Sequence, residues 1–454
     1  MFTVLSGSLS AAISRFITYE LGKENQENLN KIFSSAVTIQ LGLAGIILLL
    51  AESIGLWFLN FKMNIPISRM ELLIGYFSFQ FSLFAINLIS VPYNASIIAH
   101  ERMSAFAYIS ILEAIGKLTI AFLIAISPMD KLTFYAILMC VVAFIVRLTY
   151  GNYCKRHFSE CTYHFSWDKQ LLKQMFGFAG WNFIGASSAI LRDQGGNIVI
   201  NLFCGPTVNA ARGIAFQVNN AVNQFVTNFM TALNPQITKS YASGDKEYMM
   251  TLIFQGARLS FYMLFLLSLP ILINTHYILT LWLKMVPEHA IAFVQLTLIF
   301  ALSESISQPL ITAMLATGKI RNYQIIVGGL QMMNLPISYI FLRIGFFPEI
   351  VIIIAIIISQ SCLIARLLML RKMINISLKK YMKKVYCNII TVMIISSIIP
   401  FMLTINNDET FLTFILQSFI TIACTIITIY YIGCSKSEKL FIKNKLQKIV
   451  HKDK

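Results

Sequence analysis

The chain is poor in charged residues, and acidic residues are the scarcest. Asp, Glu, Lys and Arg together make up 12% of the 454 residues, with 20 Asp and Glu against 36 Lys and Arg. Hydrophobic residues make up 57%, and the mean hydropathy is +0.71. A soluble domain cannot place this much apolar surface in its core. The composition therefore excludes an ordinary soluble protein and predicts a membrane protein.

The sequence also lacks the patterns of common catalytic and metal chemistry. Its eight cysteines stand singly with no CxxC pair, so neither a zinc site nor a disulfide framework is supported. The six histidines are dispersed, and no HExxH, GxSxG or Walker A pattern occurs. We therefore expect no cofactor and no metal. An enzyme such as a membrane polysaccharide polymerase or ligase is disfavoured, and the missing phosphate-binding loop argues against ATP-driven transport by this chain.

What the sequence does have is a series of long apolar runs. A helix needs about 20 mostly apolar residues to cross a bilayer. Runs of this kind lie at 33–59, 71–97, 105–127, 132–153, 174–203, 207–232, 251–275, 289–315, 322–345, 348–370, 385–404 and 411–434, with a shorter stub at 1–15. The sequence predicts an all-α polytopic membrane protein with about twelve full transmembrane helices and an N-terminal half-helix.

Basic residues gather in every second gap between these runs. The densest groups are the cluster from Arg366 to Lys384 and the tail from Lys436 to Lys454. Because Lys and Arg are retained on the cytoplasmic side, the pattern predicts a multi-pass protein of a bacterial inner membrane with a cytoplasmic C-terminus. The net charge of +16 is explained by this bias and by attraction to membrane lipids, without a nucleic-acid partner.

Short patterns recur about 220 residues apart, which indicates an internal repeat. Ser90-Val91-Pro92 recurs as Ser307-Gln308-Pro309, and Leu56-Trp57 recurs as Leu281-Trp282. We expect two pseudo-symmetric helical lobes with a substrate site between them near the membrane midplane. The predicted parts are an N-lobe at 1–160, a six-helix C-lobe at 170–375, an extra helix pair at 384–434 and a basic cytoplasmic tail at 435–454. The repeat predicts that the N-lobe lacks its first helix and a half, as a truncated chain, a chain begun at an internal Met or a genuinely shortened bundle would.

Several stretches resemble a known family. They are residues 6–23, Phe178-Ala-Gly-Trp-Asn-Phe-Ile-Gly, Arg192-Asp-Gln-Gly and Asn209-Ala-Ala-Arg-Gly-Ile-Ala-Phe-Gln-Val. They are similar to bacterial polysaccharide-export flippases of the multidrug/oligosaccharidyl-lipid/polysaccharide exporter superfamily, and the likeness covers essentially the whole chain. The resemblance implies two six-helix lobes plus a helix pair, and flipping of undecaprenyl-diphosphate-linked oligosaccharide, such as O-antigen or capsule units. The absent first helix departs from the family.

The run at 207–232 carries a polar stripe. Its members recur at three- and four-residue steps, which places most of them on one helical face. They are Asn209, Arg212, Gln217, Asn220, Asn223, Gln224, Thr227, Asn228 and Thr231. Amides donate to and accept from sugar hydroxyls, and Arg212 suits a bidentate phosphate contact. The stripe therefore predicts a cavity wall, with amides that only join helices as the alternative.

Other polar residues within the apolar runs are candidates for the same cavity. Arg192, Asp193, Gln194 and Asn197 lie in the run at 174–203, where substrate contact and a structural tie are both open. Because Arg192 and Asp193 are about 100° apart around a helix, we expect each to have its own partner.

Three further ionisable residues complete the candidate set. Arg15 lies near a cytoplasmic helix end, where snorkelling is the ordinary explanation and the resemblance implies a cationic entrance. Glu113 and Lys117 share one helical face and are expected to form an internal ion pair, with ion coupling or substrate contact as alternatives.

The sequence thus predicts an alternating-access flippase for a lipid-linked oligosaccharide. Its expected partners are this substrate, membrane lipids, Na⁺ or H⁺, and polysaccharide polymerase machinery. The alternatives are a cation-coupled multidrug exporter and a lipid II flippase of the same superfamily. A cavity led by Arg and amides prefers an anion, which disfavours the drug exporter.

Overall fold

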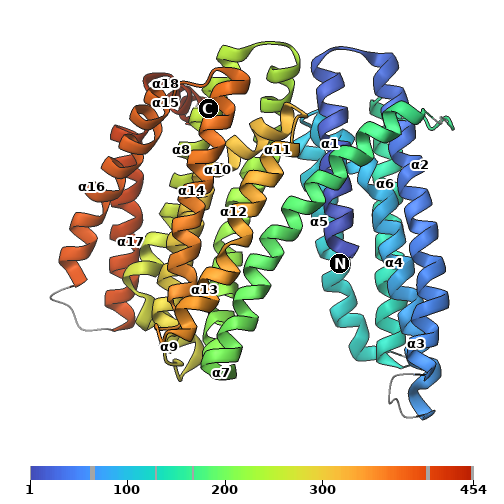
Figure 1. Ribbon diagram of the computed structural model, residues 1–454, viewed down its shortest axis with the longest axis horizontal. Coiled ribbons are helices and arrows are strands. Elements are labelled where there is room, and N and C mark those ends of the chain that lie inside the picture. Colours follow the sequence, from blue (N-terminus) through green and yellow to red (C-terminus); the bar gives the residue numbers. More distant parts are fainter. Residues whose placement is uncertain (1, 62–66, 128–129, 166–167, 405–409, 451–454) are drawn as a thin grey trace. The chain divides into compact units, whose positions relative to one another are not determined.

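The computed structural model describes residues 2–61, 67–127, 130–165, 168–404 and 410–450, and every regular element in these ranges is helical (Figure 1). The last residues of the expected basic tail, 451–454, lie outside the described residues. The chain forms two compact units. Unit 1 comprises Met1–Phe183 with Thr238–Gly244, and unit 2 comprises Ile184–Ile237 with Asp245–Lys454.

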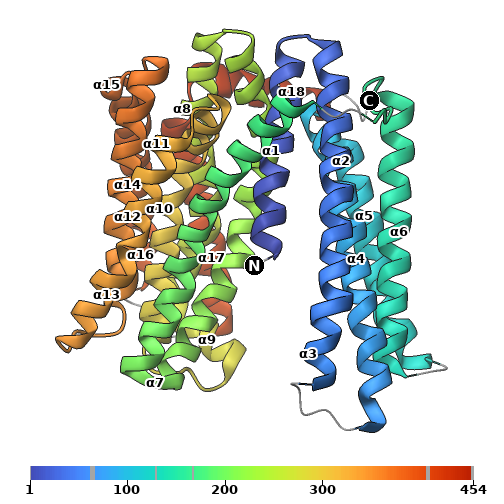
Figure 2. The same cartoon turned by 45° about the vertical axis from the view of Figure 1, so that its right-hand side comes forward.

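Unit 1 is a bundle of long helices (Figure 2). They are α1 (Phe2–Gly22), α2 (Gln26–Leu50), α3 (Leu56–Phe61), α4 (Ile67–Ala99), α5 (Met103–Leu123) and α6 (Lys131–His157). A π-helical turn at Ala51–Gly55 joins α2 to α3. Local capping fixes the helix starts: Asn25 accepts from the Asn28 N–H at 3.1 Å, and Asp130 accepts from the Leu132 N–H at 3.0 Å.

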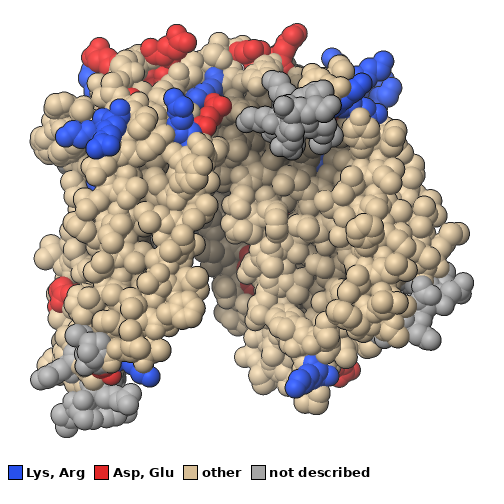
Figure 3. Space-filling model, turned by 180° about the vertical axis from the view of Figure 1, so that it is seen from behind, with Lys and Arg blue, Asp and Glu red and all other residues tan. Residues whose placement is uncertain are grey.

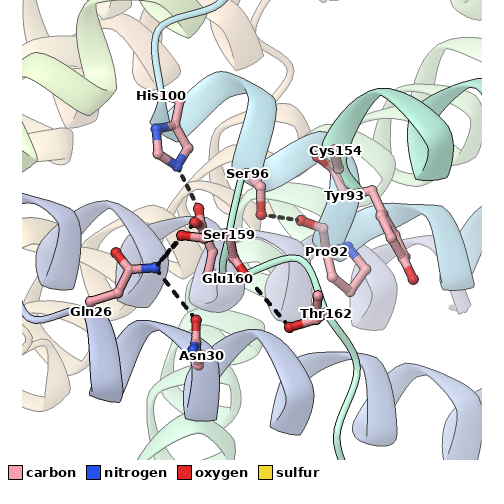
Figure 4. Close-up of polar contacts among 10 residues, drawn as sticks. All are labelled: Gln26, Asn30, Pro92, Tyr93, Ser96, His100, Cys154, Ser159, Glu160 and Thr162. Carbon is pink, nitrogen blue, oxygen red and sulfur yellow. Dashed lines mark hydrogen bonds and ion pairs between the residues drawn. The ribbon is translucent and has the colours of Figure 1, made fainter. Parts of the chain in front are cut away.

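A polar cluster around the buried Glu160 fixes one end of unit 1, where the turn after α4 meets the segment that follows α6 (Figure 4). Glu160 is 2% exposed, and its Oε1 lies 2.5 Å from His100 Nε2. Gln26 at the start of α2 donates to Ser159 Oγ at 2.9 Å. Burial raises the pKa of Glu160, but hydrogen bonds from His100, backbone and Gln26 outweigh it, so the pKa lies below its ordinary value.

Helix α7 (Lys169–Ala242) contributes residues to both units and consists of two limbs (Figure 1). Gly205 interrupts it with φ 83° and ψ 176°, a conformation that suits glycine, and Pro206 follows. Arg212 hydrogen-bonds the backbone oxygen of Asp193, 19 residues earlier, whereas a straight helix would separate them by about 28 Å. The chain therefore reverses direction at Gly205, and the parts of the two limbs, 169–204 and 206–242, that lie near this turn form a hairpin.

Unit 2 contains the rest of the helices. They are α8 (Lys246–Ile273), α9 (Thr275–Leu283), α10 (Ala290–Ala316), α11 (Arg321–Tyr323), α12 (Gly329–Met332), α13 (Asn334–Arg343), α14 (Ile350–Ile374), α15 (Leu378–Tyr381), α16 (Cys387–Thr404), α17 (Phe411–Thr428) and α18 (Lys436–Val450). Helices α8, α10 and α14 form its core, in which Phe265, Phe293 and Leu363 are almost fully buried. Three π-helical turns, at Gln324–Gly328, Met382–Tyr386 and Ile429–Gly433, lie within its longer helical runs.

The described residues contain eleven helices long and apolar enough to cross a membrane, so the protein is an all-helical, multi-pass membrane protein. The expected runs at 174–203 and 207–232 both fall within α7. This is why the described residues contain eleven such helices where about twelve spans were expected. Helix α1 extends to Gly22 and is longer than the expected stub. In each unit, most Lys and Arg side chains of the visible face gather at one end (Figure 3).

Helix ends recur at the spacing of the sequence repeat. Helix α1 ends at Gly22 and α7 at Ala242, and the next helix begins after Asn25 in one case and after Asp245 in the other. The two ends pack closely, because a Cβ added to Gly22 would lie 2.8 Å from the Cβ of Ala242. The lobe boundaries expected from the repeat stay a prediction.

One residue of the expected cytoplasmic cluster is buried within a helix. Arg366 is 1% exposed, within α14, and its Nε donates to the Tyr323 hydroxyl at 3.4 Å. The expected apolar run at 348–370 already includes this position, and the cytoplasmic placement of the cluster stays a prediction. The helix α14 runs on to Ile374.

Candidate functional site

The most enclosed part of the predicted site surrounds Arg212 in the α7 hairpin. Arg212 is 4% exposed, and its Nη1 donates to Asn197 Oδ1 and, at 3.2 Å, to the backbone oxygen of Asp193. Its Nε has no hydrogen-bond partner among the described residues. The hairpin thus fixes one edge of the guanidinium and leaves a donor for a further ligand.

Gly196 makes this arrangement sterically feasible. A Cβ at this position would lie 2.8 Å from Arg212 Nη2 and 3.1 Å from Nη1. The guanidinium therefore occupies the space that any larger residue on the first limb would fill. Because Gly196 has no side chain, the two helical limbs can bury the Arg212 guanidinium between them.

Arg192 and Asp193 pair with each other, so the expectation that each has a separate partner was wrong. Arg192 Nε donates to Asp193 Oδ1 at 2.8 Å, and Nη2 donates to Oδ2 at 3.3 Å. The long Arg side chain bridges the angle between adjacent positions, which an argument from Cβ directions overlooks. The Arg192 guanidinium also lies 4.9 Å from the Phe300 ring centroid. With Arg212, the group retains one net positive charge.

These residues line a small cavity of about 20 Å³, which we call the cationic node. Its charged and polar lining consists of Arg192, Asp193, Arg212, Thr297 and Asn334, and Phe216, Phe300, Val351, Ile352 and Ala355 form the apolar part. The node has room for a water-sized group. A phosphate would contact it from the rim or would need the surrounding helices to separate.

Farther along the second limb lies a larger cavity of about 420 Å³, which we call the amide groove. Most of its lining is polar: Asn220, Asn223, Gln224, Thr227, Thr231, Asn234 and Gln308, with Val226 and Met230. Gln308 reaches the groove from α10, and Asn234 accepts from the Thr312 hydroxyl of the same helix at 2.6 Å. Its amides and hydroxyls suit a ligand rich in hydroxyl groups.

The other predicted residues of α7 lie outside the two cavities. Gln217 and Asn228 are exposed, and Asn228 Oδ1 accepts from Gln224 Nε2 at 3.2 Å. Gln194 is exposed and accepts from Asn197 Nδ2 at 3.2 Å. Asn209 is half-buried near the hairpin turn, and its Oδ1 has no partner among the described residues. The predicted stripe is therefore divided between the node, the groove and the exposed surface.

The remaining candidates belong to unit 1. The Arg15 guanidinium lies 4.5 Å from the Tyr19 ring centroid and 4.8 Å from that of Phe16, so aromatic rings surround it. Glu113 and Lys117 form the expected pair at 2.6 Å, with side chains 41% and 52% exposed. Their exposure makes the pair a surface one within the unit. A coupling role for it stays a prediction.

Sequence reasoning missed the residues that other helices contribute. Phe300 and Gln308 of α10 and Asn334 of α13 line the two cavities. Asn234 extends the stripe by one three-residue step beyond Thr231 and was detectable from spacing alone. Among the described residues there is no group of three or more His, Cys, Asp or Glu that could hold a metal ion.

The fold places the chain among proteins with the MATE-like fold. It is similar to a crystallised point mutant of a MATE protein (14% identity, TM-score 0.73, covering 82% of this chain and 84% of that one). It is also similar to an outward-facing multidrug resistance MATE family transporter of the MOP superfamily (15% identity, TM-score 0.70, covering 82% of this chain and 85% of that one). A third similar structure is a MOP superfamily transporter from Pyrococcus furiosus (15% identity, TM-score 0.67, covering 82% of this chain and 85% of that one).

At these identities the likeness shows the fold alone, and the family comes from the sequence. The family model described as "Polysaccharide biosynthesis protein" matches residues 1–241, more than half of the chain. The chain belongs to this family. No curated protein matches the chain.

Proposed function

We propose that the protein is a flippase that moves undecaprenyl-diphosphate-linked oligosaccharide from the cytoplasmic to the periplasmic leaflet of a bacterial inner membrane. The substrate combines an anionic diphosphate, a chain of sugars and a long apolar tail. The family supports a role in polysaccharide synthesis, and the fold is that of membrane transporters. The cationic node carries the proposal, because it places a positively charged side chain deep within an apolar helical unit.

The chemistry of the two cavities matches the two polar parts of this substrate. Arg212 keeps an Nε that has no partner among the described residues, and the node keeps one net positive charge, which suits a diphosphate oxygen. The amide groove offers donors and acceptors to sugar hydroxyls. The lipid tail would stay in the bilayer during transfer, so no apolar cavity for it is required.

In the proposed mechanism two lobes and an appended helix pair rock so that the head group is exposed first to the cytoplasm and then to the periplasm. A Na⁺ or H⁺ gradient, or coupling to polymerisation by partner enzymes, would supply the energy. Arg15 would add to the cationic entrance. A C-terminus on the cytoplasmic side agrees with the basic residues of α18.

The charge of the node favours this substrate over the lipophilic cations of multidrug exporters. The similar transporter from Pyrococcus furiosus has a binding pocket of reverse polarity, which suggests a different function for that protein. In this chain the node is positively charged, with two Arg against one Asp. A lipid II flippase shares the diphosphate, so it differs from our proposal in the sugars that the amide groove would contact.

The proposal is tested in cells that lack their own polysaccharide flippase. The chain is expressed with Arg212→Ala or Arg192→Ala, and surface polysaccharide is measured against membrane protein level. We expect both variants to lose surface polysaccharide at unchanged protein level, while lipid-linked oligosaccharide accumulates in the cytoplasmic leaflet. Arg343→Ala is the matched control, because Arg343 lies at the end of α13, away from both cavities.

Normal surface polysaccharide in both Arg variants would refute the role of the cationic node. Failure of the unmodified chain to restore polysaccharide, together with resistance to cationic drugs, would instead identify a multidrug exporter. Rescue of a lipid II flippase deletion by the unmodified chain would assign the other alternative.

A further inference from the structure

A third cavity lies in unit 2, and none of its lining residues lines the cationic node or the amide groove. Its volume is about 520 Å³, and it is lined from α8, from the π-helical turn Met382–Tyr386 with the first turn of α16, and from the residues around the start of α18. The lining includes Arg258, Lys383 and Lys384, together with Thr251, Asn388 and Ser435. Within the described part of the chain, no acidic residue lines it.

The walls of this cavity are fixed by specific contacts. Arg258 Nη2 lies 2.8 Å from Glu438 Oε1, and both side chains are largely buried, at 11% and 13% exposed. Glu438 Oε2 also accepts from the Ser435 N–H at 2.6 Å, which anchors the start of α18. Asn388 accepts from the Tyr262 hydroxyl and donates to the Ile432 oxygen at 3.1 Å. Helix α18 is therefore joined to α8 at the edge of the cavity.

The cavity carries excess positive charge. Lys383 and Lys384 are exposed, and neither side chain has an ion pair or hydrogen bond within the described chain. Glu438 neutralises Arg258 alone, so the two lysines give the cavity its excess charge. Ammonium groups, amides and hydroxyls converging on one space are the donors that bind phosphate.

The position of the cavity indicates what carries that phosphate. It lies along the first half of α8, from Thr251 to Arg258, and at the start of α16, and both helices belong to apolar runs long enough to cross the membrane. Basic pockets between transmembrane helices on the cytoplasmic side bind anionic lipid head groups. Phe254 adds an apolar side chain to the lining.

We propose that this cavity binds the phosphate group of an anionic membrane lipid. The proposal does not depend on the transported substrate. Two lipids share the required chemistry: an anionic phospholipid of the cytoplasmic leaflet, and the polyprenyl phosphate carrier. In both cases Lys383 and Lys384 contact the phosphate, and the amide and hydroxyl groups complete its hydrogen bonds.

The test is native mass spectrometry of the purified full chain in detergent, with added phosphatidylglycerol, phosphatidylcholine or undecaprenyl phosphate. We expect phosphatidylglycerol to bind and phosphatidylcholine not to. Because each Lys near a membrane surface contributes about 1 kcal/mol, the double change Lys383→Gln with Lys384→Gln should weaken binding about thirty-fold. Lys379→Gln with Lys380→Gln is the matched control, because it removes the same charge from residues outside the lining.

Each outcome decides the proposal. Equal binding of the two phospholipids, or equal losses in the two double variants, would overturn it. Displacement of bound lipid by millimolar inorganic phosphate would also overturn it, in favour of a site for soluble phosphate. Displacement of phosphatidylglycerol by an equimolar amount of undecaprenyl phosphate supports the proposal and identifies the carrier, whereas retention identifies the bulk phospholipid. Surface polysaccharide is not a readout here, so failure is distinguishable from failure of the flippase proposal.

Discussion

The role of Gly196 allows the cationic node to be perturbed without removing any polar group. In the variant Gly196→Ala, the new methyl group would lie 2.8 Å from Arg212 Nη2, whereas ordinary contact begins at 3.4 Å. The guanidinium must therefore move by about 0.6 Å. Its bond to the Asp193 oxygen is already 3.2 Å, at the long limit for N–H···O, so a shift of this size weakens or breaks it.

The effect on folding should be small, because two contributions oppose each other. Losing a hydrogen bond from a charged donor costs about 1.5–3 kcal/mol. Replacing Gly by Ala inside a helix gains about 1 kcal/mol. The expected loss in free energy of unfolding is therefore about 0.5–2 kcal/mol, while the orientation of Arg212 is lost. Gly213→Ala is the matched control, because a Cβ there meets nothing within 4 Å.

The assay compares thermal unfolding of each purified variant with the surface polysaccharide that it restores in cells. We expect Gly196→Ala to lose most of its activity while its free energy of unfolding falls by no more than about 2 kcal/mol, and Gly213→Ala to keep both activity and stability. Asn197→Ala should reproduce the loss, because it removes the second acceptor of Arg212. Full activity in Gly196→Ala would refute the reasoning that the hairpin orients Arg212 for function.

Two further predictions concern unit 1. Glu160→Gln should lower the free energy of unfolding by about 1.5–3 kcal/mol at neutral pH. The folded-state pKa of Glu160 lies below its ordinary value, so the ionised side chain stabilises the fold above that ordinary value. This stabilisation is lost as the pH falls through the folded-state pKa. The unfolding temperatures of variant and parent should therefore differ at pH 7 and converge in acid. Gly22→Ala places a methyl group 2.8 Å from the Lys239 backbone and should lower the free energy of unfolding by about 1–3 kcal/mol. In the control Gly7→Ala the new methyl group meets nothing within 4 Å, so this change should be neutral. Equal unfolding temperatures of the two variants would contradict the close packing of these helix ends.

The membrane fold was predictable from hydropathy because each crossing helix must be apolar over its whole length. The apolar runs also located the turn at Gly205, which falls between the runs at 174–203 and 207–232. Hydropathy did not reveal that Arg366, within the run at 348–370, is buried beside Tyr323, because a buried Arg and an exposed one near a helix end look alike in the sequence. The π-helical turns had no visible signal in the sequence, because three of the four described turns lie within apolar runs that read as continuous helix.

Prediction of the site was limited by what spacing along a single helix can reveal. The three- and four-residue steps identified Asn220 and Asn223, which line the amide groove. They gave no indication of Gln308 or Phe300, because residues from another helix enter a cavity only through tertiary packing. The pairing of Arg192 with its neighbour was missed for a related reason: side-chain length, as well as direction from the axis, decides which groups meet.

The division of the stripe into two cavities bears on the choice of substrate. Arg212 and Asn223 are eleven positions apart on one limb, which corresponds to about 16 Å along a helix. A compact drug molecule would engage the node or the groove, but a ligand that engages both must be extended and must be anionic at one end and rich in hydroxyl groups at the other. An oligosaccharide linked through a diphosphate has this order of groups. We therefore expect Asn223→Ala to reduce transfer of oligosaccharide units while leaving binding of a diphosphate lipid without sugars intact. Equal losses for both ligands would argue against separate roles for the two cavities.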